Sequence, residues 1–287
     1  MKEITILSGK GGTGKTSITA AIASTAKNAV FCDNDVDAAD LHLIFHPEVV
    51  EEHTFFSGYV ASIDDDKCAG CGICVDHCRF DAIHYKDMGG LYINAFQCEG
   101  CRLCERVCPV QAITSQRNSN NYWYVSNIRM GKMVHAKMGS GEENSGKLVS
   151  QVRQRAREIA KETGAEYVIN DGPPGIGCAA ISSVTGTDAV LLVIEPTHSG
   201  LHDVGRVVEL IESFKIPSFA LVNKYDINRE VVSEIEALLE KKNIPLLAKI
   251  PFDKQMVESM VIGQTIVEYN PHSEISKMIE EVWKAIK

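Results

Sequence analysis

The 287-residue sequence predicts an α/β fold: a doubly wound, mostly parallel sheet interrupted by a small inserted α+β domain. Three observations support this prediction. Short apolar segments alternate with helical patterns, a glycine-rich turn follows the first apolar segment, and a cysteine-rich repeat interrupts the alternation. We therefore assign residues 1–58 and 118–287 to one discontinuous domain and residues 59–117 to the insert.

The composition is that of an ordinary folded protein, with 45% hydrophobic and 23% charged residues. No apolar run approaches the roughly 18 residues needed to span a bilayer, and the first residues lack the apolar region of a signal peptide. We therefore expect a cytoplasmic protein. The net charge of -9 argues against a nucleic-acid partner, because phosphate binding usually requires a basic face.

The first predicted strand, residues 3–7, and the first predicted helix, residues 15–27, flank the segment SGKGGTGKT. This segment satisfies the motif G-x-x-x-x-G-K-[ST], which is typical of P-loop NTPases. Its backbone N–H groups approach phosphate oxygens, its lysine meets the β- and γ-phosphates, and its hydroxyl holds Mg²⁺. The predicted nucleotide-binding residues are Gly9, Lys10, Gly11, Gly12, Thr13, Gly14, Lys15 and Thr16.

A second lysine, Lys10, gives the loop the form K-G-G-x-G-K-T, which resembles the MinD/ParA/nitrogenase iron protein class of ATPases. The resemblance implies that ATP and Mg²⁺ bind here and that an ATP-dependent homodimer forms. It also implies that Lys10 acts in trans on the partner's phosphates, beside Lys15 in cis. The residues alone also allow a solvated loop lysine at this position. We expect slow basal hydrolysis, since no further catalytic arginine or glutamine is recognisable near these loops.

The second predicted strand, residues 28–32, ends in a run of aspartates. Carboxylates at the carboxyl end of a parallel strand can hold metal-bound waters or orient an attacking water. The family resemblance implies that Asp35 contacts the hydrolytic water and that Asp33 lies nearer the Mg²⁺ shell. For Asp37 and Asp40 we expect a capping or surface role.

Eight of the ten cysteines form two sets with the spacing C-x2-C-x2-C-x3-C, and the second set follows the first by thirty residues. This offset indicates an internal duplication. Three thiolates at this spacing can hold one [4Fe-4S] cluster while the fourth reaches the other cluster. The predicted ligands are Cys68, Cys71, Cys74 and Cys108 for the first cluster, and Cys98, Cys101, Cys104 and Cys78 for the second. Structural zinc is the less favoured alternative, because zinc sites typically use two separated C-x-x-C pairs.

Residues 59–117 resemble the bacterial two-cluster ferredoxins, including the Cys108-Pro109 step that ends the second set. The resemblance implies a small ferredoxin-like α+β domain. The first set departs from the pattern, because Arg79 rather than proline follows Cys78.

Beyond the insert, the segment 139–147 resembles a stretch in insert-bearing MinD-like ATPases, although it also suits the start of the predicted helix 148–161. The predicted strand 166–170 leads to Asp171, which resembles the Mg²⁺-binding aspartate of the family's switch II. Cys178 resembles a cluster cysteine of the nitrogenase iron protein, but the other ligand cysteine has no counterpart. We therefore expect a buried or occasionally redox-active thiol.

Two further strands are predicted at residues 189–194 and 219–222. The family resemblance implies that Asn223 hydrogen-bonds adenine and that Pro251 and Phe252 flank the base. A strand-end cap and a turn with a core phenylalanine remain open as alternatives. The last helix carries an apolar face whose flanking charges cancel, so we expect core packing and no membrane anchor.

An ATPase site and two clusters in one chain suggest coupling. The favoured hypothesis is that nucleotide-dependent dimerisation gates electron transfer through the clusters to a partner protein, an electron donor or acceptor or a metallocluster protein. A cluster carrier or assembly ATPase resembling the Mrp group is one alternative. A MinD-like positioning or scaffold switch with redox-sensing clusters is the other. Complete thiolate ligation of both clusters favours electron transfer, but the sequence names neither donor nor acceptor.

Overall fold

The computed structural model describes residues 1–56, 58–139 and 145–287, and the chain divides into two compact units. The first unit comprises residues 1–53, 123–137 and 145–287; the second comprises residues 54–122 and 138–144. The whole range predicted for the insert, 59–117, falls in the second unit. Within the glycine- and serine-rich segment 139–147, residues 140–144 lie outside the described residues.

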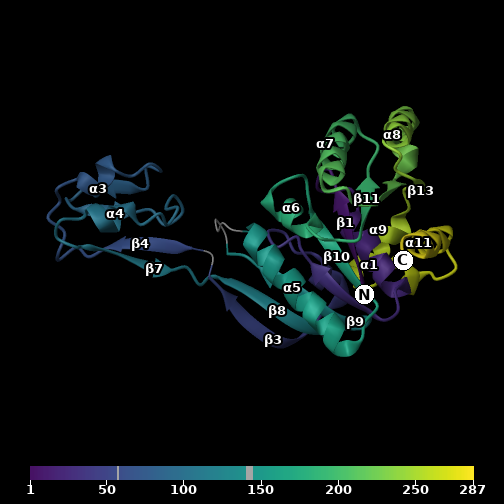
Figure 1. Cartoon of the computed structure of the whole chain (residues 1–287), viewed down its shortest axis with the longest axis horizontal. Helices are drawn as coiled ribbons and strands as arrows, with labels where there is room; N and C mark the ends of the chain where they lie inside the picture. Colours follow the sequence, from purple (N-terminus) through teal and green to yellow (C-terminus); the bar gives the residue numbers. More distant parts are fainter. Residues whose placement is uncertain (57, 140–144) are drawn as a thin grey trace. The chain divides into compact units, whose positions relative to one another are not determined.

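The first unit is built on one sheet, whose described strands follow the order β13-β12-β11-β1-β10-β2-β9-β8-β3 (Figure 1). The pairs from β13 to β9 are all parallel, which confirms the predicted mostly parallel α/β sheet. The strands are β1 Lys2–Ser8, β2 Ala29–Asp33, β3 Glu48–Phe55, β8 Asn121–Ile128, β9 Gly131–Lys137, β10 Tyr167–Pro174, β11 Ala189–Ile194, β12 Ser218–Asn223 and β13 Leu246–Ile250.

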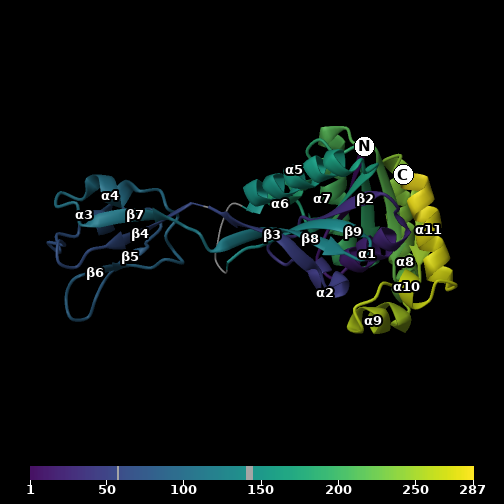
Figure 2. The same ribbon diagram turned by 90° about the horizontal axis from the view of Figure 1, so that it is seen from below.

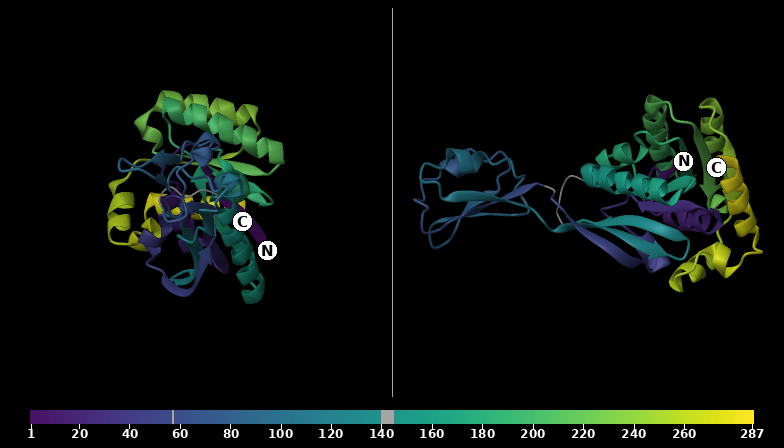
Figure 3. Two further views of the ribbon diagram at one scale, coloured as in Figure 1. Left: turned by 90° about the vertical axis from the view of Figure 1, so that its left-hand side faces the viewer. Right: turned by 60° about the horizontal axis from the view of Figure 1, so that its bottom comes forward.

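Helices cover both faces of this sheet, and Figures 2 and 3 show the layers from other directions. The helices are α1 Lys15–Thr25, α2 Leu41–Phe45, α5 Ser145–Thr163, α6 Cys178–Val184, α7 His198–Phe214, α8 Arg229–Lys241, α9 Lys254–Val261, α10 Ile266–Tyr269 and α11 Glu274–Ile286, with a 3₁₀ helix at Tyr225–Ile227. One core joins α1 and α11 to the sheet, and another joins α7 and α8 to it.

Helix α11 buries its apolar face in the core, as predicted. Ile275, Ile279 and Val282 are all buried against the cluster that contains Ile18 and Ile22 of α1. Within the described part of the chain, no helix combines the length and apolar character required to cross a membrane.

Strand β10 is longer than predicted, because its pairing with β1 continues to Ser8 opposite Pro174. Asp171 therefore lies within the strand, where it is in register with Asp33 of β2. Since neighbouring parallel strands end at the same edge of a sheet, this register brings two predicted magnesium-site carboxylates to one edge.

Among its described residues, the second unit contains two antiparallel strand pairs and two short helices. These elements are β4 Tyr59–Ile63, α3 Ile73–Asp76, β5 Ile83–Tyr85, β6 Leu91–Ile93, α4 Leu103–Val107 and β7 Ile113–Arg117. Its two halves repeat the same backbone turns thirty residues apart. Gly70 and Gly100 have φ of 65° and 62°, and Asp81 and Gln111 have φ of 50° and 52°. The duplication in the sequence is therefore also a duplication of local structure.

Candidate nucleotide site and cysteine sites

The P-loop joins β1 to α1, and its glycines are required by its geometry. Gly12 and Gly14 have φ of 79° and 86°, in the left-handed region that L side chains rarely adopt. A Cβ atom on Gly14 would also collide with the side-chain amide of Asn223, and one on Gly9 would lie 2.8 Å from the backbone of Asp203. Larger residues would therefore distort the loop.

A cavity of about 920 Å³ lies over this loop, a volume within the usual range for small-molecule sites. The P-loop lines it from Gly11 to Thr16, together with Asp35, Pro173 and Asn223. The Thr13 hydroxyl is buried beside this cavity and has no hydrogen-bond partner among the described residues. An unpaired buried donor at a cavity is consistent with a ligand that supplies the missing bond.

Lys15, Thr16 and Asp171 are brought together, as the predicted site requires. Lys15 Nζ lies 2.9 Å from Asp171 Oδ1, and both side chains are buried. The Thr16 hydroxyl donates to Asp171 Oδ2 at 2.7 Å. Thr19 donates to Oδ1 at 2.6 Å and was not anticipated, although its position four residues after Lys15 places both on one face of α1.

Asp33 is completely buried and turns both carboxylate oxygens to backbone donors. Oδ1 accepts from the N–H of Asp35 at 3.1 Å, and Oδ2 accepts from the N–H of Leu41 at 3.2 Å. Burial, followed by the neighbouring Asp171 carboxylate, raises the pKa of Asp33 well above its usual range. Burial also raises the pKa of Asp35 to about 6, while Lys15 opposes the shift. These carboxylates therefore form a site in which a bound cation would relieve charge repulsion.

Asp37 and Asp40 both line the nucleotide cavity. Asp40 stands at the N-terminus of α2, but its side chain makes no capping hydrogen bond there. Of the expected capping or surface role, the capping part is wrong for Asp40, whereas both residues are exposed.

Lys10 is held within its own chain by Glu195, a residue that the sequence analysis missed. Lys10 Nζ lies 3.0 Å from Glu195 Oε2 and donates to Thr197 Oγ1 at 2.8 Å. The other oxygen, Oε1, lies 2.7 Å from Lys224 Nζ, which also donates to the carbonyl of Gly12 at 3.2 Å. Glu195 directly follows β11, and this position at the ligand edge of the sheet was the available signal.

The predicted base-side residues border the same cavity. Asn223 Nδ2 donates to the carbonyl of Thr13 at 2.8 Å, so this amide braces the P-loop. Pro251 and Phe252 line the cavity, and the Phe252 ring is half exposed. The alternative of a core phenylalanine is therefore wrong, whereas the adenine contact remains a prediction.

Cys178 is exposed, which corrects the expectation of a buried thiol. It is the first residue of α6 and lines the cavity, because α6 begins directly after the loop that follows β10. Helix α5 packs closely against it, since a Cβ on Gly146 would lie 3.2 Å from Cys178 Cβ. Cys32, by contrast, is fully buried as expected.

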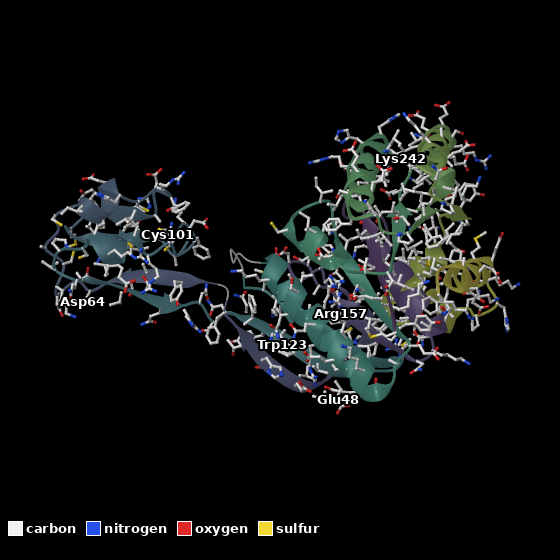
Figure 4. The ribbon with its side chains drawn as sticks, viewed as in Figure 1. Glu48, Asp64, Cys101, Trp123, Arg157 and Lys242 are labelled. Carbon is white, nitrogen blue, oxygen red and sulfur yellow. The ribbon has the colours of Figure 1, made fainter. Side chains whose placement is uncertain are left out.

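The eight repeated cysteines of the second unit divide between two small cavities, and Figure 4 labels Cys101 among them. One cavity is lined by Cys68, Cys71, Cys74 and Cys108; the other by Cys78, Cys98, Cys101 and Cys104. Each cavity thus combines three cysteines of one set with the last cysteine of the other. The backbone N–H groups of Ala82 and Ala112 donate to the sulfurs of Cys78 and Cys108 at 3.4 and 3.3 Å.

Each cavity offers four thiols, which is the number of protein ligands that one [4Fe-4S] cluster takes. Within the described ranges, no three His, Cys, Asp or Glu side chains form a site for a single metal ion. A cubane takes one thiolate on each of four irons, so its ligands surround a space rather than converge on one point. Burial raises the pKa of Cys104 to about 11 and raises that of Cys74. Ionisation of these thiols therefore has to accompany metal binding.

Comparison with known proteins identifies the family to which the chain belongs. The CbiA family, described as the CobQ/CobB/MinD/ParA nucleotide binding domain, matches residues 4–266. An uncharacterized protein of Methanocaldococcus jannaschii is 32% identical over 290 residues, covering 99% of this chain and 96% of that protein. An iron-sulfur cluster carrier protein of Pyrococcus abyssi is 30% identical over 138 residues, 43% of this chain and 46% of that protein.

Among solved structures, the septum site-determining protein MinD complexed with Mg-ADP, from Pyrococcus horikoshii OT3, has the same fold. Its TM-score is 0.59 with 19% identity, and the match covers 100% of this chain and 96% of that chain. From the match over residues 4–266, the chain belongs to the CobQ/CobB/MinD/ParA family of nucleotide-binding P-loop ATPases.

Proposed function

We propose that this protein is an ATP-hydrolysing iron–sulfur protein in which nucleotide-dependent dimerisation gates electron transfer through two [4Fe-4S] clusters to a partner protein. The observation that carries the proposal is the division of eight cysteines into two cavities of four thiols, in a chain that also holds a P-loop site. Four thiolates complete the ligand set of each cluster. The domain at residues 59–117 is accordingly a ferredoxin-like insert.

In this proposal the P-loop residues bind MgATP and stabilise the transition state of its hydrolysis. Lys15 neutralises charge that develops on the phosphates. Thr16 and Asp171, already joined at 2.7 Å, hold the Mg²⁺ ion and its waters together with Asp33. Asp35 lines the cavity and orients the attacking water.

Lys10 has a second position in the proposed cycle. In the single chain its ammonium group is paired with Glu195 at 3.0 Å. When two chains close over ATP, Lys10 leaves Glu195 for the phosphates of the partner. The Glu195 carboxylate keeps its second cation, Lys224, at 2.7 Å, so this partly buried carboxylate stays paired after the exchange. Asn223, Pro251 and Phe252 form the side of the cavity that receives the base.

A matched set of lysine variants tests the ATP-dependent part of the proposal. Lys10→Ala is expected to bind ATP but fail to dimerise, whereas Lys15→Ala is expected to lose hydrolysis altogether. Lys27→Ala is the control, because Lys27 is an exposed lysine outside the cavity. Light scattering and phosphate release with MgATP report the two steps. A Lys10→Ala protein that dimerises normally with ATP would contradict the trans role.

A cluster carrier is the second candidate, favoured by the similarity to the iron-sulfur cluster carrier protein of Pyrococcus abyssi. In that case the clusters are cargo, and ATP promotes their release to an acceptor. Anaerobic incubation of the iron-loaded protein with an apo-ferredoxin distinguishes the candidates. Retention of iron and sulfide in the presence of ATP supports electron transfer, and ATP-dependent loss to the acceptor supports the carrier.

A further inference from the structure

At one left-handed backbone position, the two duplicated halves of the second unit carry a glycine in the first half and a charged residue in the second. Gly72 and Arg102 occupy equivalent places, each between the second and third cysteine of its set and each at the N-terminus of a short helix. Both have left-handed backbones, with φ of 76° and 63°. Glycine adopts this conformation freely, whereas arginine does so at a cost. A strained residue beside a site is a reason to look for a function of its side chain.

The Arg102 side chain is held in place beside the second cavity, which it lines. Its Nε donates to Glu105 Oε2 at 2.9 Å, and its guanidinium carbon lies 4.7 Å from the centre of the Tyr59 ring. In the first half, a Cβ on Gly72 would lie 2.7 Å from the hydroxyl of Tyr85, an exposed side chain. Gly72 itself supplies no side chain, so the first half carries no cation at this position.

The charges around the two cavities also differ. Among the described residues that line the first cavity, none is charged; apart from its cysteines they are Ile63, Ala69, Ile73, Leu91, Pro109, Val110, Ala112 and Ile113. The second cavity is lined by Arg102, Glu99 and His77. Glu99 is exposed, so water screens its charge more than that of the half-buried Arg102.

The segments that precede the two cysteine sets reinforce this difference. Asp64, Asp65 and Asp66 stand before the first set, where the second set has Asn94, Ala95 and Phe96. Lys67 pairs with Asp64 at 2.8 Å and Lys86 pairs with Asp65 at 2.7 Å. These pairs offset part of the negative charge that precedes the first set.

We propose that the two cluster sites are inequivalent and that Arg102 raises the reduction potential of the site formed by Cys78, Cys98, Cys101 and Cys104. This inference rests on the proposed function. Reduction adds one negative charge to a cluster. Arg102 is paired with Glu105, but only Arg102 of this pair lines the second cavity, so the positive partner lies nearer the added charge. The first cavity has an uncharged lining and follows a run of acids, which disfavours the added charge. A single electron from a low-potential reductant therefore resides mainly at the second site.

The test is an EPR-monitored redox titration of the anaerobically reconstituted full chain with titanium(III) citrate. The wild type is expected to show two one-electron midpoint potentials. They are expected to differ by at least about 59 mV, which corresponds to a tenfold preference of the first electron for one site. Arg102→Gly is expected to lower the upper midpoint and leave the lower one in place. It retains the backbone conformation that Gly72 adopts in the duplicate half, so folding is preserved.

Two further variants separate charge from structure. Arg102→Lys keeps the charge and is expected to retain most of the separation. Arg106→Gln removes an exposed cation of α4 that lines neither cavity, and both midpoints are expected to stay unchanged. Two results would overturn the inference while leaving the proposed function intact. One is a wild type whose two midpoints coincide, and the other is an Arg102→Gly variant in which either neither midpoint or both midpoints shift. A chain that binds no iron and sulfide would overturn both.

Discussion

The Thr13 hydroxyl, which has no hydrogen-bond partner in the part of the chain that the structure describes, offers a direct residue-scale test of the nucleotide site. A buried hydroxyl without a partner costs about 1 kcal/mol or more in the free protein, and a phosphate oxygen or a metal-bound water would relieve that cost. Thr13→Val is therefore expected to leave the free protein at least as stable and to weaken MgADP binding about tenfold. Isothermal titration calorimetry and thermal unfolding measure the two effects.

Thr19→Val is the matched control for this prediction. Its hydroxyl is buried but paired, donating to Asp171 at 2.6 Å. The substitution is expected to destabilise the free protein by about 1–3 kcal/mol, because it leaves a buried carboxylate short of a donor. Unchanged MgADP affinity in Thr13→Val would show that this hydroxyl does not face the ligand.

At the scale of residues, motif spacing predicted which side chains come together within the P-loop and within each cysteine set. Contacts between distant segments could not be predicted in this way. The P-loop and the cysteine sets are short motifs, so their residues could be named from the sequence. Glu195 was missed because its role depends on Lys10 and Lys224, which come from two other loops. The exposure of Cys178 depends on where α6 begins relative to the cavity, which a residue pattern does not specify.

At the scale of elements, a buried ion pair ties α5 to β1. Arg153 Nη2 lies 2.7 Å from Glu3 Oε1, and both side chains are buried. The other guanidinium nitrogen, Nη1, donates to the carbonyls of Ser182 and Thr185 at the end of α6. The pair thereby joins α5, β1 and the helix that follows Asp171.

Arg153→Met is expected to lower the free energy of unfolding by about 3 kcal/mol, because it leaves Glu3 buried without its main partner. Arg157→Met is the control: this arginine contacts the same carboxylate at 2.6 Å but is one-third exposed, so the expected loss is about 1 kcal/mol or less. Denaturant unfolding measures both. Equal decreases in the free energy of unfolding of the two variants would contradict the leading role of Arg153 in joining α5 to β1.

His135 makes the pairing of β8 with β9 sensitive to acid. It is hydrogen-bonded to Ser126 at 2.9 Å, and burial lowers the pKa of His135 to about 4. Between the unfolded pKa of about 6.5 and this value, only the unfolded chain takes up the proton. Protonation of His135 therefore does not affect the free energy of unfolding above pH 6.5. As the pH falls from 6.5 toward 4, the free energy of unfolding decreases by up to about 3 kcal/mol.

His135→Gln is expected to flatten this part of the stability profile, whereas His272→Gln, at an exposed histidine, leaves the profile unchanged. Urea unfolding of each protein at pH 7 and at pH 4.5 gives the comparison. The account is wrong if His135→Gln loses as much stability on acidification as the wild type.

The buried strands were predictable at this scale, and the edge strands were not. β11 is apolar throughout and has its predicted bounds. β3 is mostly exposed and includes three glutamates, so it carries no strand pattern, and its partner β8 lies about 70 residues further along the chain. Such pairings depend on tertiary contacts rather than on local preference.

At the scale of the whole molecule, the chain combines a nucleotide-binding domain of known family with a unit that contains two four-cysteine cavities. The family and the parallel sheet were predictable, because the P-loop and alternating strands and helices occur in that order. The ferredoxin-like identity of the second unit remains a prediction from its cysteine spacing. The functional link between the units rests on the proposed coupling of ATP to electron transfer.

The measurement that tests this coupling most directly compares cluster midpoint potentials in three nucleotide states. Anaerobically reconstituted protein is titrated without nucleotide, with MgADP and with a nonhydrolysable ATP analogue, while light scattering follows dimerisation. We predict that the ATP analogue alone produces the dimer and shifts at least one potential on the order of tens of millivolts. Stable clusters whose potentials are the same in all three states, despite a dimer with the analogue, would contradict the account.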